Sequence, residues 1–457
     1  MPAVPAPAPE ATRRSPLGAT DPDALGPALL RFVEEILPYR RSLTGDGLRQ
    51  TLAAIGEHVP LDVTEVPTGT AVFDWTIPPE WRVQEAHVTA SDGQRVVDWD
   101  GSALALVQYS VPVREQMSLR DLRAHLYTAP DHPTLTPYRT GYYTPTWGFC
   151  LSQRRLDALA ETYGEDAFFD VHIASEHVEG SLTYGEVVVP GATDREILLS
   201  AHACHPALAN DNASSLAVAT ALARGLMDGP PLRHTVRFLF APGTLGAIAW
   251  LAQNQDRWER VAGGLVLANL GDAGGFTYKQ SRRGTLGSPL PIDRAVALAL
   301  RDRGEPVDAR PFAPTGYDER QFGSPGVDLP VGRLTRTPHG EYPEYHTSGD
   351  NLSLLRPASL AGSVGALADV VAVFDGDGTF LNTAPFGEPH LGRRGLYAAL
   401  GGRADSPALQ RATLWVLNLS DGAHSLLDVA ERSGLPFRTV RAAADALLDA
   451  DLLRPSP

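Results

Sequence analysis

The chain of 457 residues contains almost no lysine or cysteine and has no long hydrophobic run. Cys150 and Cys204 are its only cysteines, too few for a disulfide framework, so a cytoplasmic location is expected. No apolar run approaches the roughly 20 residues that cross a bilayer, so we expect no membrane partner. Among 39 basic residues only Lys279 is a lysine. An amine kept there is a candidate for a compact, titratable point charge in a catalytic site, and chance survival of a single lysine is the alternative.

Positive charge is scarce overall. The formal net charge of −15 argues against a nucleic-acid partner, because phosphate binding requires basic surface. Residues 1–22 are rich in Pro and Ala and lack an apolar stretch after Arg13 and Arg14. This excludes secretory and twin-arginine signals and predicts a disordered tail. With 43% hydrophobic and 20% charged residues, the remainder can bury two or three cores.

Hydrophobic patterning divides the remainder into a core, an insert and a C-terminal unit. Residues 23–60 and 151–378 alternate helical periods with short apolar strands, which predicts an α/β fold with a mostly parallel sheet and helices on both faces. Residues 61–150 change to short alternating strands with Pro and Trp, which predicts an inserted all-β domain. The expected core strands are residues 170–175, 185–191, 196–201, 235–243 and 264–271; the expected helices are residues 27–40, 47–59, 153–163, 214–228, 244–254, 293–304 and 358–375.

The C-terminal unit, residues 379–457, carries two helical periods around the turn SGLP, the spacing of a helix-turn-helix. Arg438 and Arg441 open its second helix, where a DNA-binding protein presents basic residues. Three aspartates follow on the same segment, and such units also serve as packing modules. We expect packing rather than DNA binding.

Three histidines and an aspartate stand at recognisable strand ends. His202, His205 and Asp211 lie in SAHACHPALANDNASS (200–215), directly after the apolar run EILLSA, and His346 lies in EYHTSGDN (344–351). In α/β enzymes the chemistry lies beyond the carboxyl ends of the strands. Neutral imidazoles and a carboxylate are the ligands that Zn²⁺ prefers. A single histidine is more often an ordinary surface or core residue, so the predicted zinc site depends on the four residues together.

A strand ending in His, followed by an N-D-N segment and an Ala-rich helix, resembles the zinc exopeptidases of the aminopeptidase class. The resemblance implies that His202, Asp211 and a late His, here His346, bind metal. It also implies that Asp272, after the strand GLVLANL, completes a metal site. A Gly-rich turn with an Asp is equally a common loop signal, so a loop role for Asp272 stays open.

Longer segments resemble one bacterial family of aminopeptidase-like proteins. They include LPYRRSLTGDGLRQTL (37–52), EVPTGTAVFDWTIPPEW (65–81), GDAGGFTYKQSRRG (271–284) and YDERQFGSPGVDLPVGRLTRTPHGEYPEYHTSGDNL (317–352). Members of this family have an inserted small β domain and a C-terminal winged helix, and are described as a domain of unknown function or as polysaccharide-biosynthesis proteins. The resemblance therefore implies a zinc-exopeptidase-like core for residues 23–60 and 151–378, and a winged helix for residues 379–457.

The chain departs from this family after the strand TVRFLFAP. Relatives carry a Glu in a P-E-T-type motif, whereas this chain has Gly243 between Pro242 and Thr244. The resemblance gives that Glu the role of base or metal ligand. In such a mechanism zinc lowers the pKa of water toward about 7 and a carboxylate takes its proton. Glycine can do neither, so another acid must serve or peptidase activity is lost.

The carboxylates nearest the late His are the candidates for that acid. Glu341 is the first candidate, and Glu319 and Glu344 are the others, although each is more often a salt-bridge partner. The candidates for holding a substrate carboxylate or an oxyanion are Arg320, Arg336, Tyr342 and Tyr345.

Two functions follow. The first is a zinc-dependent amidohydrolase that removes an aminoacyl or small acyl group from a small peptide or aminoacylated metabolite in biosynthesis, with homo-oligomerisation left open. The second is a diverged protein that binds such a ligand, or another protein, without hydrolysis. The loss at Gly243 favours the second. The retained metal ligands favour the first, because random decay damages ligands as readily as a base.

Overall fold

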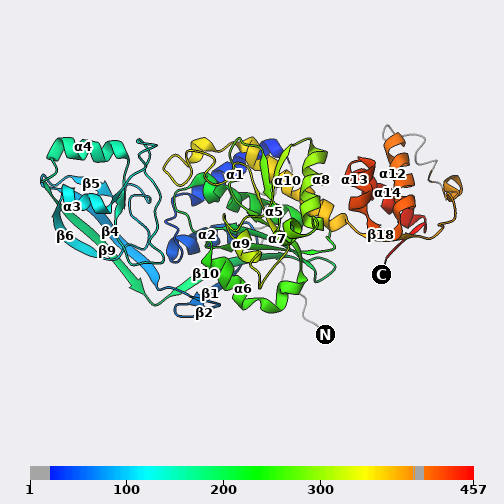
Figure 1. Cartoon of the computed structure of the whole chain (residues 1–457), viewed down its shortest axis with the longest axis horizontal. Coiled ribbons are helices and arrows are strands. Elements are labelled where there is room, and N and C mark those ends of the chain that lie inside the picture. The colour runs from blue at the N-terminus through cyan, green and yellow to red at the C-terminus, as the bar shows by residue number, and fades with distance from the viewer. Residues whose placement is uncertain (1–20, 395, 397–405, 457) are drawn as a thin grey trace.

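The computed structural model describes residues 21–394, 396 and 406–456. Figure 1 shows three bodies in a row: a small sheet with α3 and α4 at one end, an α/β core in the middle and a helical unit at the other end. The predicted tail, residues 1–22, lies outside the described residues except for its last two. Asp21 accepts a hydrogen bond from the Asp23 backbone as the N-cap of α1, and Pro22 begins that helix.

Eight strands form the central sheet in the order β1-β10-β12-β11-β13-β16-β14-β15. The middle strands β12, β11, β13 and β16 run parallel, while β1, β10 and β14 join by antiparallel pairing. The sheet is therefore mixed and mostly parallel at its centre, as predicted. Its strands are β1 Asp62–Pro67, β10 Ser181–Val189, β11 Glu196–His202, β12 Thr235–Ala241, β13 Val261–Leu267, β14 Phe276–Lys279, β15 Val307–Arg310 and β16 Val331–Thr335.

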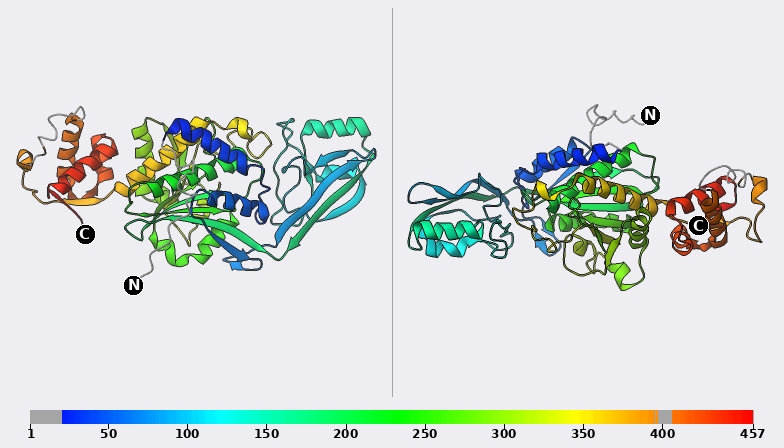
Figure 2. Two further views of the ribbon diagram at one scale, coloured as in Figure 1. Left: turned by 180° about the vertical axis from the view of Figure 1, so that it is seen from behind. Right: turned by 90° about the horizontal axis from the view of Figure 1, so that it is seen from above.

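Helices cover both faces of this sheet (Figure 2). Every residue of β11 is buried, because Ile197 and Leu199 pack with α1, α2, α5, α8 and α10 while Leu198 packs with α6 and α9 on the opposite face. The core helices are α1 Pro22–Ile36, α2 Asp46–Gly56, α5 Ser215–Asp228, α6 Leu245–Gln253, α7 Arg282–Leu286, α8 Pro291–Arg303, α9 Glu319–Phe322 and α10 Pro357–Gly376.

Helix α10 is, within the described part of the chain, the single helix long and apolar enough to cross a membrane by composition. The mean hydropathy of its most apolar stretch of 18 residues is 1.6, and 50% of that stretch is buried inside the protein. The helix packs against α1, α5 and α8 in the core, which accounts for its apolar character.

The insert is a four-stranded antiparallel sheet in the order β5-β4-β9-β6, with α4 beside it. Its composition differs from the predicted range 61–150. Strand β1 was expected in the insert but belongs to the central sheet, whereas α4 and β9 were expected in the core but belong to the insert. The reason is that β9 pairs with β4 from Glu80↔Val178 to Ala90↔Phe169 before the chain returns to the core. The insert elements are β4 Glu80–Ala90, β5 Arg95–Asp98, β6 Val113–Ser118, α3 Leu119–Leu122, α4 Gln153–Tyr163 and β9 Phe168–Val178.

Two small two-stranded sheets flank these bodies. Strands β2 (Ala71–Val72) and β3 (Trp75–Thr76) form a hairpin whose loop residue Phe73 is exposed. Strands β7 (Leu126–Tyr127) and β8 (Phe149–Cys150) pair in parallel beside the insert.

Within its described residues, the C-terminal unit packs helices α12, α13 and α14 with a sheet ordered β18-β17-β19. The end of α14 that carries Arg438 and Arg441 packs on the core: the Phe437 backbone N–H donates to Asp302 at 2.7 Å, and Arg441 donates to the Gly376 carbonyl at 3.1 Å. The elements are β17 Thr379–Asn382, α12 Ser406–Leu419, β18 Asp421–Ser425, α13 Leu426–Ser433, α14 Phe437–Asp449 and β19 Leu453–Pro455.

Candidate metal centre

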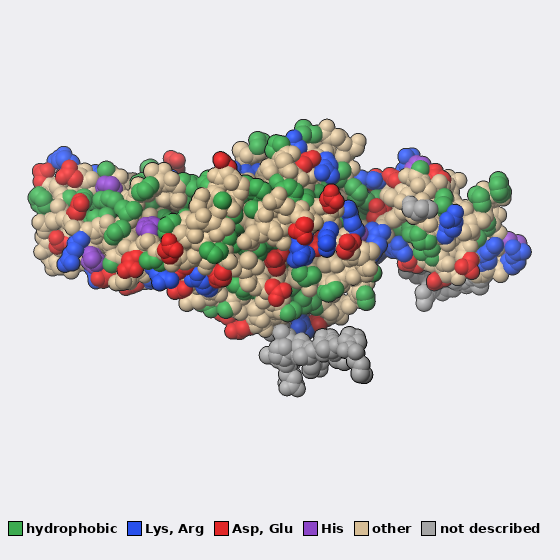
Figure 3. Space-filling view, turned by 90° about the horizontal axis from the view of Figure 1, so that it is seen from below, with side chains coloured by type: hydrophobic (Ala, Val, Ile, Leu, Met, Phe, Trp, Pro, Cys, Tyr) green, Lys and Arg blue, Asp and Glu red, His purple; other side chains and the backbone are tan. Residues whose placement is uncertain are grey.

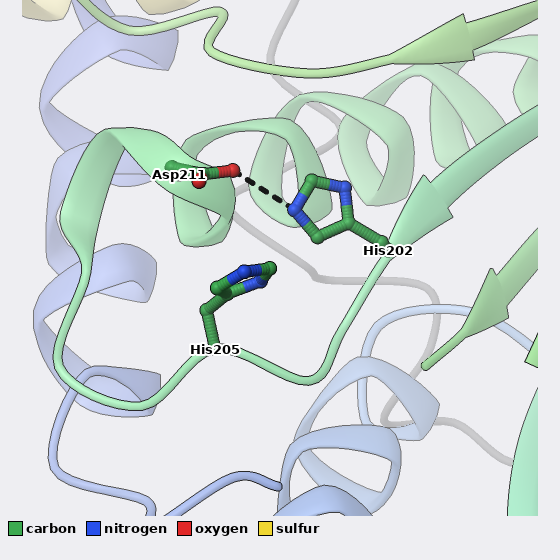
Figure 4. A group of neighbouring side chains, drawn as sticks. All are labelled: His202, His205 and Asp211. Carbon is green, nitrogen blue, oxygen red and sulfur yellow. Dashed lines mark hydrogen bonds and ion pairs between the residues drawn. The ribbon is translucent and has the colours of Figure 1, made fainter. Parts of the chain in front are cut away.

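The carboxyl edge of the parallel strands brings the predicted zinc ligands together. His202 is the last residue of β11, and Asp211 lies in the irregular turn η4 (Ala209–Ser214) that precedes α5. Figure 4 shows the His202 and Asp211 side chains pointing toward each other, with the His205 ring facing both from the connecting loop. One ligand atom from each of the three lies within 4.8 Å of the others.

His346 completes the group from the late loop. Its Nε2 lies 3.1 Å from Asp211 Oδ2, while His202 Nε2 lies 2.9 Å from Asp211 Oδ1. The aspartate thus has one imidazole at each oxygen. His202 and Asp211 are 1% and 0% exposed, whereas the His346 side chain is 34% exposed and forms the open side of the site.

Burial and neighbouring charges shift the pKa values of Asp211, His205 and Cys204. Burial alone would raise the pKa of Asp211, but the attraction of His205 and the hydrogen bond and charge of His202 hold it well below its usual range. Burial lowers the pKa of His205 well below the ordinary value, against the opposing attraction of Asp211. Cys204 is also buried, and burial raises the pKa of its thiol to about 12, which leaves it a protonated neighbour rather than a thiolate ligand.

A second layer of hydrogen bonds fixes the turn that carries Asp211. The Asp350 carboxylate accepts the backbone N–H groups of Asn210 at 2.5 Å and of Asp211 at 3.0 Å. Burial raises the pKa of Asp350 to about 7. The Asn212 amide donates to the carbonyls of His202 at 3.2 Å and Leu267 at 3.1 Å, which ties the turn to β11 and β13. Such outer contacts orient metal ligands.

Asp272 does not join the ligand group. Its oxygens accept hydrogen bonds from the Asn210 amide at 2.9 Å, the Thr337 hydroxyl at 2.6 Å and the Gly274 backbone at 2.7 Å. Both oxygens are therefore used inside the protein. These contacts are those of a residue that stabilises a loop, which is the alternative role left open for Asp272.

Lys279 and Glu319 lie together behind the site as a buried ion pair. The Lys279 ammonium approaches Glu319 Oε1 at 2.5 Å and also donates to the carbonyls of Ala313 and Thr315 at 3.0 and 2.5 Å. All three of its protons are used, and burial lowers its pKa. Arg333 contacts the same Glu319 oxygen at 3.3 Å. These contacts give both predicted catalytic residues a structural role.

Glu341, the first candidate base, lines the cleft and pairs with Arg310. Arg310 binds both of its oxygens, one of them at 3.0 Å, and this pairing lowers the pKa of the half-exposed carboxyl. The carboxylate is an exposed ion-pair partner, which corrects its expected role as a base.

The four residues predicted to bind substrate lie in different surroundings. Arg336 donates to Ser363, Gly274 and Ser359, so its guanidinium is used within the core. Arg320 is exposed. Tyr345 stacks on His346 with ring centroids 3.9 Å apart, and Tyr342 donates to Asp350 at 3.2 Å. Only the two tyrosines line the cleft beside the ligands.

That cleft has a volume of about 600 Å³ and lies between a loop of residues 128–139 and a loop of residues 340–347. The first loop is fixed to the second, because the Tyr138 backbone N–H donates to the His346 carbonyl at 2.7 Å and that of Ser348 to the Thr136 carbonyl at 2.8 Å. The Tyr138 ring contacts the rings of both His205 and His346, with centroids 5.1 Å away. A segment of residues 61–150 therefore forms one wall of the site.

Two functional candidates in the site were not found from the sequence. Arg41, in the segment LPYRRSLTGDG, is buried and donates to the His205 carbonyl at 2.7 Å, so it holds that loop. Asp318 is buried at 1% exposure, and neither of its oxygens has a hydrogen-bond partner in the described part of the chain. Burial raises the pKa of Asp318 to about 6. Asp318 directly precedes Glu319 in the motif YDERQFG, and that motif predicted Glu319, rather than Asp318, as a candidate acid.

Parallel strands with histidines and an aspartate at their carboxyl edge define an α/β protein of the aminopeptidase-like fold. The chain belongs to the family described as a domain of unknown function (DUF4910), which matches residues 30–377, and a winged helix-turn-helix family matches residues 378–455. A protein of Clostridium acetobutylicum, provisionally named a polysaccharide biosynthesis protein with an aminopeptidase-like domain, is 42% identical over 429 residues, 94% of this chain and 96% of that protein.

Solved structures agree with this placement. One from Clostridium acetobutylicum, provisionally described as a peptidase, is 40% identical with a TM-score of 0.87, covering 95% of this chain and 97% of that one. A zinc aminopeptidase from Bacillus subtilis has a TM-score of 0.55 at 11% identity, covering 76% and 94% of the two chains. A peptidase M28 precursor from Shewanella amazonensis has a TM-score of 0.54 at 16% identity, covering 80% and 94%. The last two show the fold alone. The predicted family and fold class are confirmed.

Proposed function

We propose that the protein is a zinc-dependent amidohydrolase that removes an aminoacyl or small acyl group from a small peptide or aminoacylated metabolite. The observation that carries this proposal is the convergence of three imidazoles on Asp211 at the carboxyl edge of the sheet. The donor set fits zinc, because imidazole nitrogens and a carboxylate oxygen are ligands that this ion prefers. The name of the Clostridium acetobutylicum relative supports a role in biosynthesis.

We expect the site to bind one zinc ion per chain. His202, His205, His346 and Asp211 would hold it, and the ion would supply Lewis acidity to the amide carbonyl and to water. A second ion would lack protein ligands, since Gly243 carries no acid and the oxygens of Asp272 are already used.

The cleft supports a small substrate. Its volume of about 600 Å³ matches a ligand of metabolite or dipeptide size. The loop of residues 128–139 closes one side, and we propose that the insert limits access in this way. Acidic and basic side chains alternate over the face in Figure 3, which supports a small-molecule partner rather than a nucleic acid.

Hydrolysis of matched amides tests this function. Zinc-loaded protein should release the amine from dipeptide-sized aminoacyl amides, and should cleave unstructured peptides of ten or more residues much more slowly. Asp211→Ala should abolish both activities. Equal rates on long and short amides would contradict the role of the cleft.

Absence of hydrolysis with zinc bound favours the second function, ligand binding without turnover. Gly243 is the specific observation behind it, because no carboxylate follows β12. Calorimetric titration with a non-hydrolysed aminoacyl compound would then still show binding, and Tyr342→Ala should weaken it.

A further inference from the structure

Asp318 is a buried carboxylate that has no hydrogen-bond partner in the described part of the chain. It is the N-cap residue of α9, a position where an Asp side chain normally accepts a helix N–H, yet it makes no such bond. Both oxygens are buried without a hydrogen bond. An uncompensated buried carboxylate destabilises a fold, so this one calls for an explanation other than structure.

The carboxylate lies in the space beside Gly243. A β-carbon at position 243 would lie 3.4 and 3.5 Å from the two Asp318 oxygens and 3.1 Å from the β-carbon of His202. Asp318 therefore reaches the place where a side chain at the end of β12 would begin. Glycine at 243 leaves that place open.

The preceding residue fixes this placement against the metal ligands. The Tyr317 ring stacks on the His202 ring, with centroids 4.8 Å apart and planes 19° apart. The Tyr317 hydroxyl meets the Asn269 amide at 3.3 Å. A buried aromatic stack of this kind holds Asp318 next to His202.

The oxygens of Asp318 stand outside the group of ligand atoms formed by His202, His205 and Asp211. A carboxylate next to a metal site but outside its ligand set is placed to handle protons. Glu341 and Glu319 are not, since each is held by cations.

Resting on the proposed hydrolase function, we propose that Asp318 is the proton acceptor of the reaction, supplying from the start of α9 the carboxylate that Gly243 does not provide. As the oxygen of water bonds to the amide carbon, one water proton passes to the Asp318 carboxylate. As the carbon–nitrogen bond breaks, Asp318 gives that proton to the leaving nitrogen. The products are a carboxylic acid and an amine, and Asp318 is regenerated.

Asp318→Asn is the first test, on zinc-loaded full-length protein. We expect unchanged zinc content, a Tm equal to or above that of wild type, a kcat lower by about 10²–10⁴-fold and a KM within about threefold. Loss of zinc would make Asp318 a ligand, and an unchanged kcat would make it dispensable; either result overturns the proposal.

Asp293→Asn is the matched control. Asp293 is also a buried aspartate, but it accepts hydrogen bonds from Tyr278 at 2.7 Å and from the Ser281 backbone at 2.9 Å. This variant should lower the Tm and leave kcat unchanged. If Asp318→Asn lowers the Tm as Asp293→Asn does and leaves kcat unchanged, Asp318 is structural and the proposal fails.

A swap of the two positions tests the shared space. Gly243→Glu alone should not raise activity, because it brings a second carboxylate against Asp318. Asp318→Ala combined with Gly243→Glu should recover at least about tenfold of the activity lost in Asp318→Ala. The φ angle of Gly243 is not positive, so the backbone angle does not oppose a side chain there, but its β-carbon would lie 3.1 Å from the His202 β-carbon and that residue must shift by a few tenths of an ångström. A folded, zinc-containing double variant as inactive as Asp318→Ala would contradict the proposal.

Acetohydroxamic acid gives a readout that needs no substrate. This acid binds as the anion and therefore loses a proton on binding. Near neutral pH the wild-type protein should keep that proton on Asp318, whereas the Asp318→Asn protein should release it to the buffer. Calorimetry in two buffers of different ionisation enthalpy measures the difference. Proton retention without hydrolysis of any amide would refute the hydrolase function and keep Asp318 as the proton acceptor of the site. Equal proton release from both proteins would overturn the proposal for Asp318.

Discussion

Two adjacent clusters of buried charge differ in how completely they are paired. In the cluster behind the site, one Glu319 oxygen meets both Lys279 and Arg333, while its other oxygen has no hydrogen-bond partner in the described part of the chain. In the metal centre, each Asp211 oxygen meets an imidazole nitrogen, and Asp318 meets no hydrogen-bond donor among the described residues. The two acids Asp318 and Glu319 are neighbours in the chain.

The difference separates residues that hold the fold from residues available for chemistry. A buried ion pair with its donors used responds to mutation through stability. A buried acid without a partner weakens the fold and is free to exchange a proton.

Removing a metal ligand should have the largest effect. Asp211→Ala and His346→Ala should each lose tightly bound zinc, because each removes a donor from the small set available to the ion. Elemental analysis after dialysis measures the loss. His132→Ala is the control, since this histidine lines the cleft outside the ligand group and its removal should leave zinc in place. Zinc lost from His132→Ala as well would contradict the assigned ligands.

Breaking the paired cluster should act on stability. Glu319→Gln leaves Lys279 and Arg333 buried without an anion, and should lower the free energy of unfolding by about 3–5 kcal/mol. Denaturant unfolding of the metal-free protein measures the change. Asp318→Asn, one residue away, should not lower it. A fall of similar size in both variants would remove the distinction between the two clusters.

The pH dependence of stability should differ in sign between paired and unpaired acids. The pKa of Asp318 in the folded protein is raised to about 6, so the folded state binds more protons and this group favours folding increasingly as the pH falls through 6 toward its unfolded value of about 3.9. Asp318→Asn should remove that contribution in metal-free protein. Unfolding curves between pH 4 and 7 compare the two proteins, and parallel pH profiles would refute the expectation.

Asp375 provides the opposite case. Burial raises its pKa, but the hydrogen bond from His234 at 2.9 Å and two backbone N–H groups outweigh this and lower it. Asp375 therefore stabilises the fold at pH values above the pKa that it has in the unfolded chain. This stabilisation is lost as the pH falls through the lower pKa that it has in the folded protein. Asp375→Asn should therefore make the free energy of unfolding fall less steeply as the pH is lowered, whereas Asp318→Asn should make it fall more steeply.

The smallest effect is expected at the surface between core and C-terminal unit. Arg294 pairs with Asp428 at 2.9 Å and Glu431 at 2.7 Å, and these groups are partly exposed. Arg294→Ala should cost no more than about 1 kcal/mol. A loss of several kcal/mol would show that this pairing, rather than apolar packing, holds the unit to the core.

Much of the fold follows from local pattern. The apolar runs of β11 and β12 and the helical period of α4 lie where the sequence predicts them, because hydrophobic periodicity reports burial directly. Strand β16 (Val331–Thr335) was missed inside a loop-rich stretch. Its buried Arg333 reads as a surface residue in sequence, and only the partner Glu319 makes its burial possible.

The site was predictable where the signal is local and not where it depends on pairing. His202, His205 and Asp211 share one short segment, and His346 stands in a distinct motif, so their grouping follows from strand ends. The state of Asp318, Glu319 and Glu341 depends on which cation lies beside each. That information comes from residues far away in the chain, such as Lys279 and Arg310.

The zinc content of the wild-type protein tests the central claim most directly. After exposure to zinc and exhaustive dialysis, elemental analysis should find about one zinc per chain, held by the donor set around Asp211. Two retained equivalents would show a second set of ligands that this geometry does not provide. No retained zinc would contradict the metal centre itself.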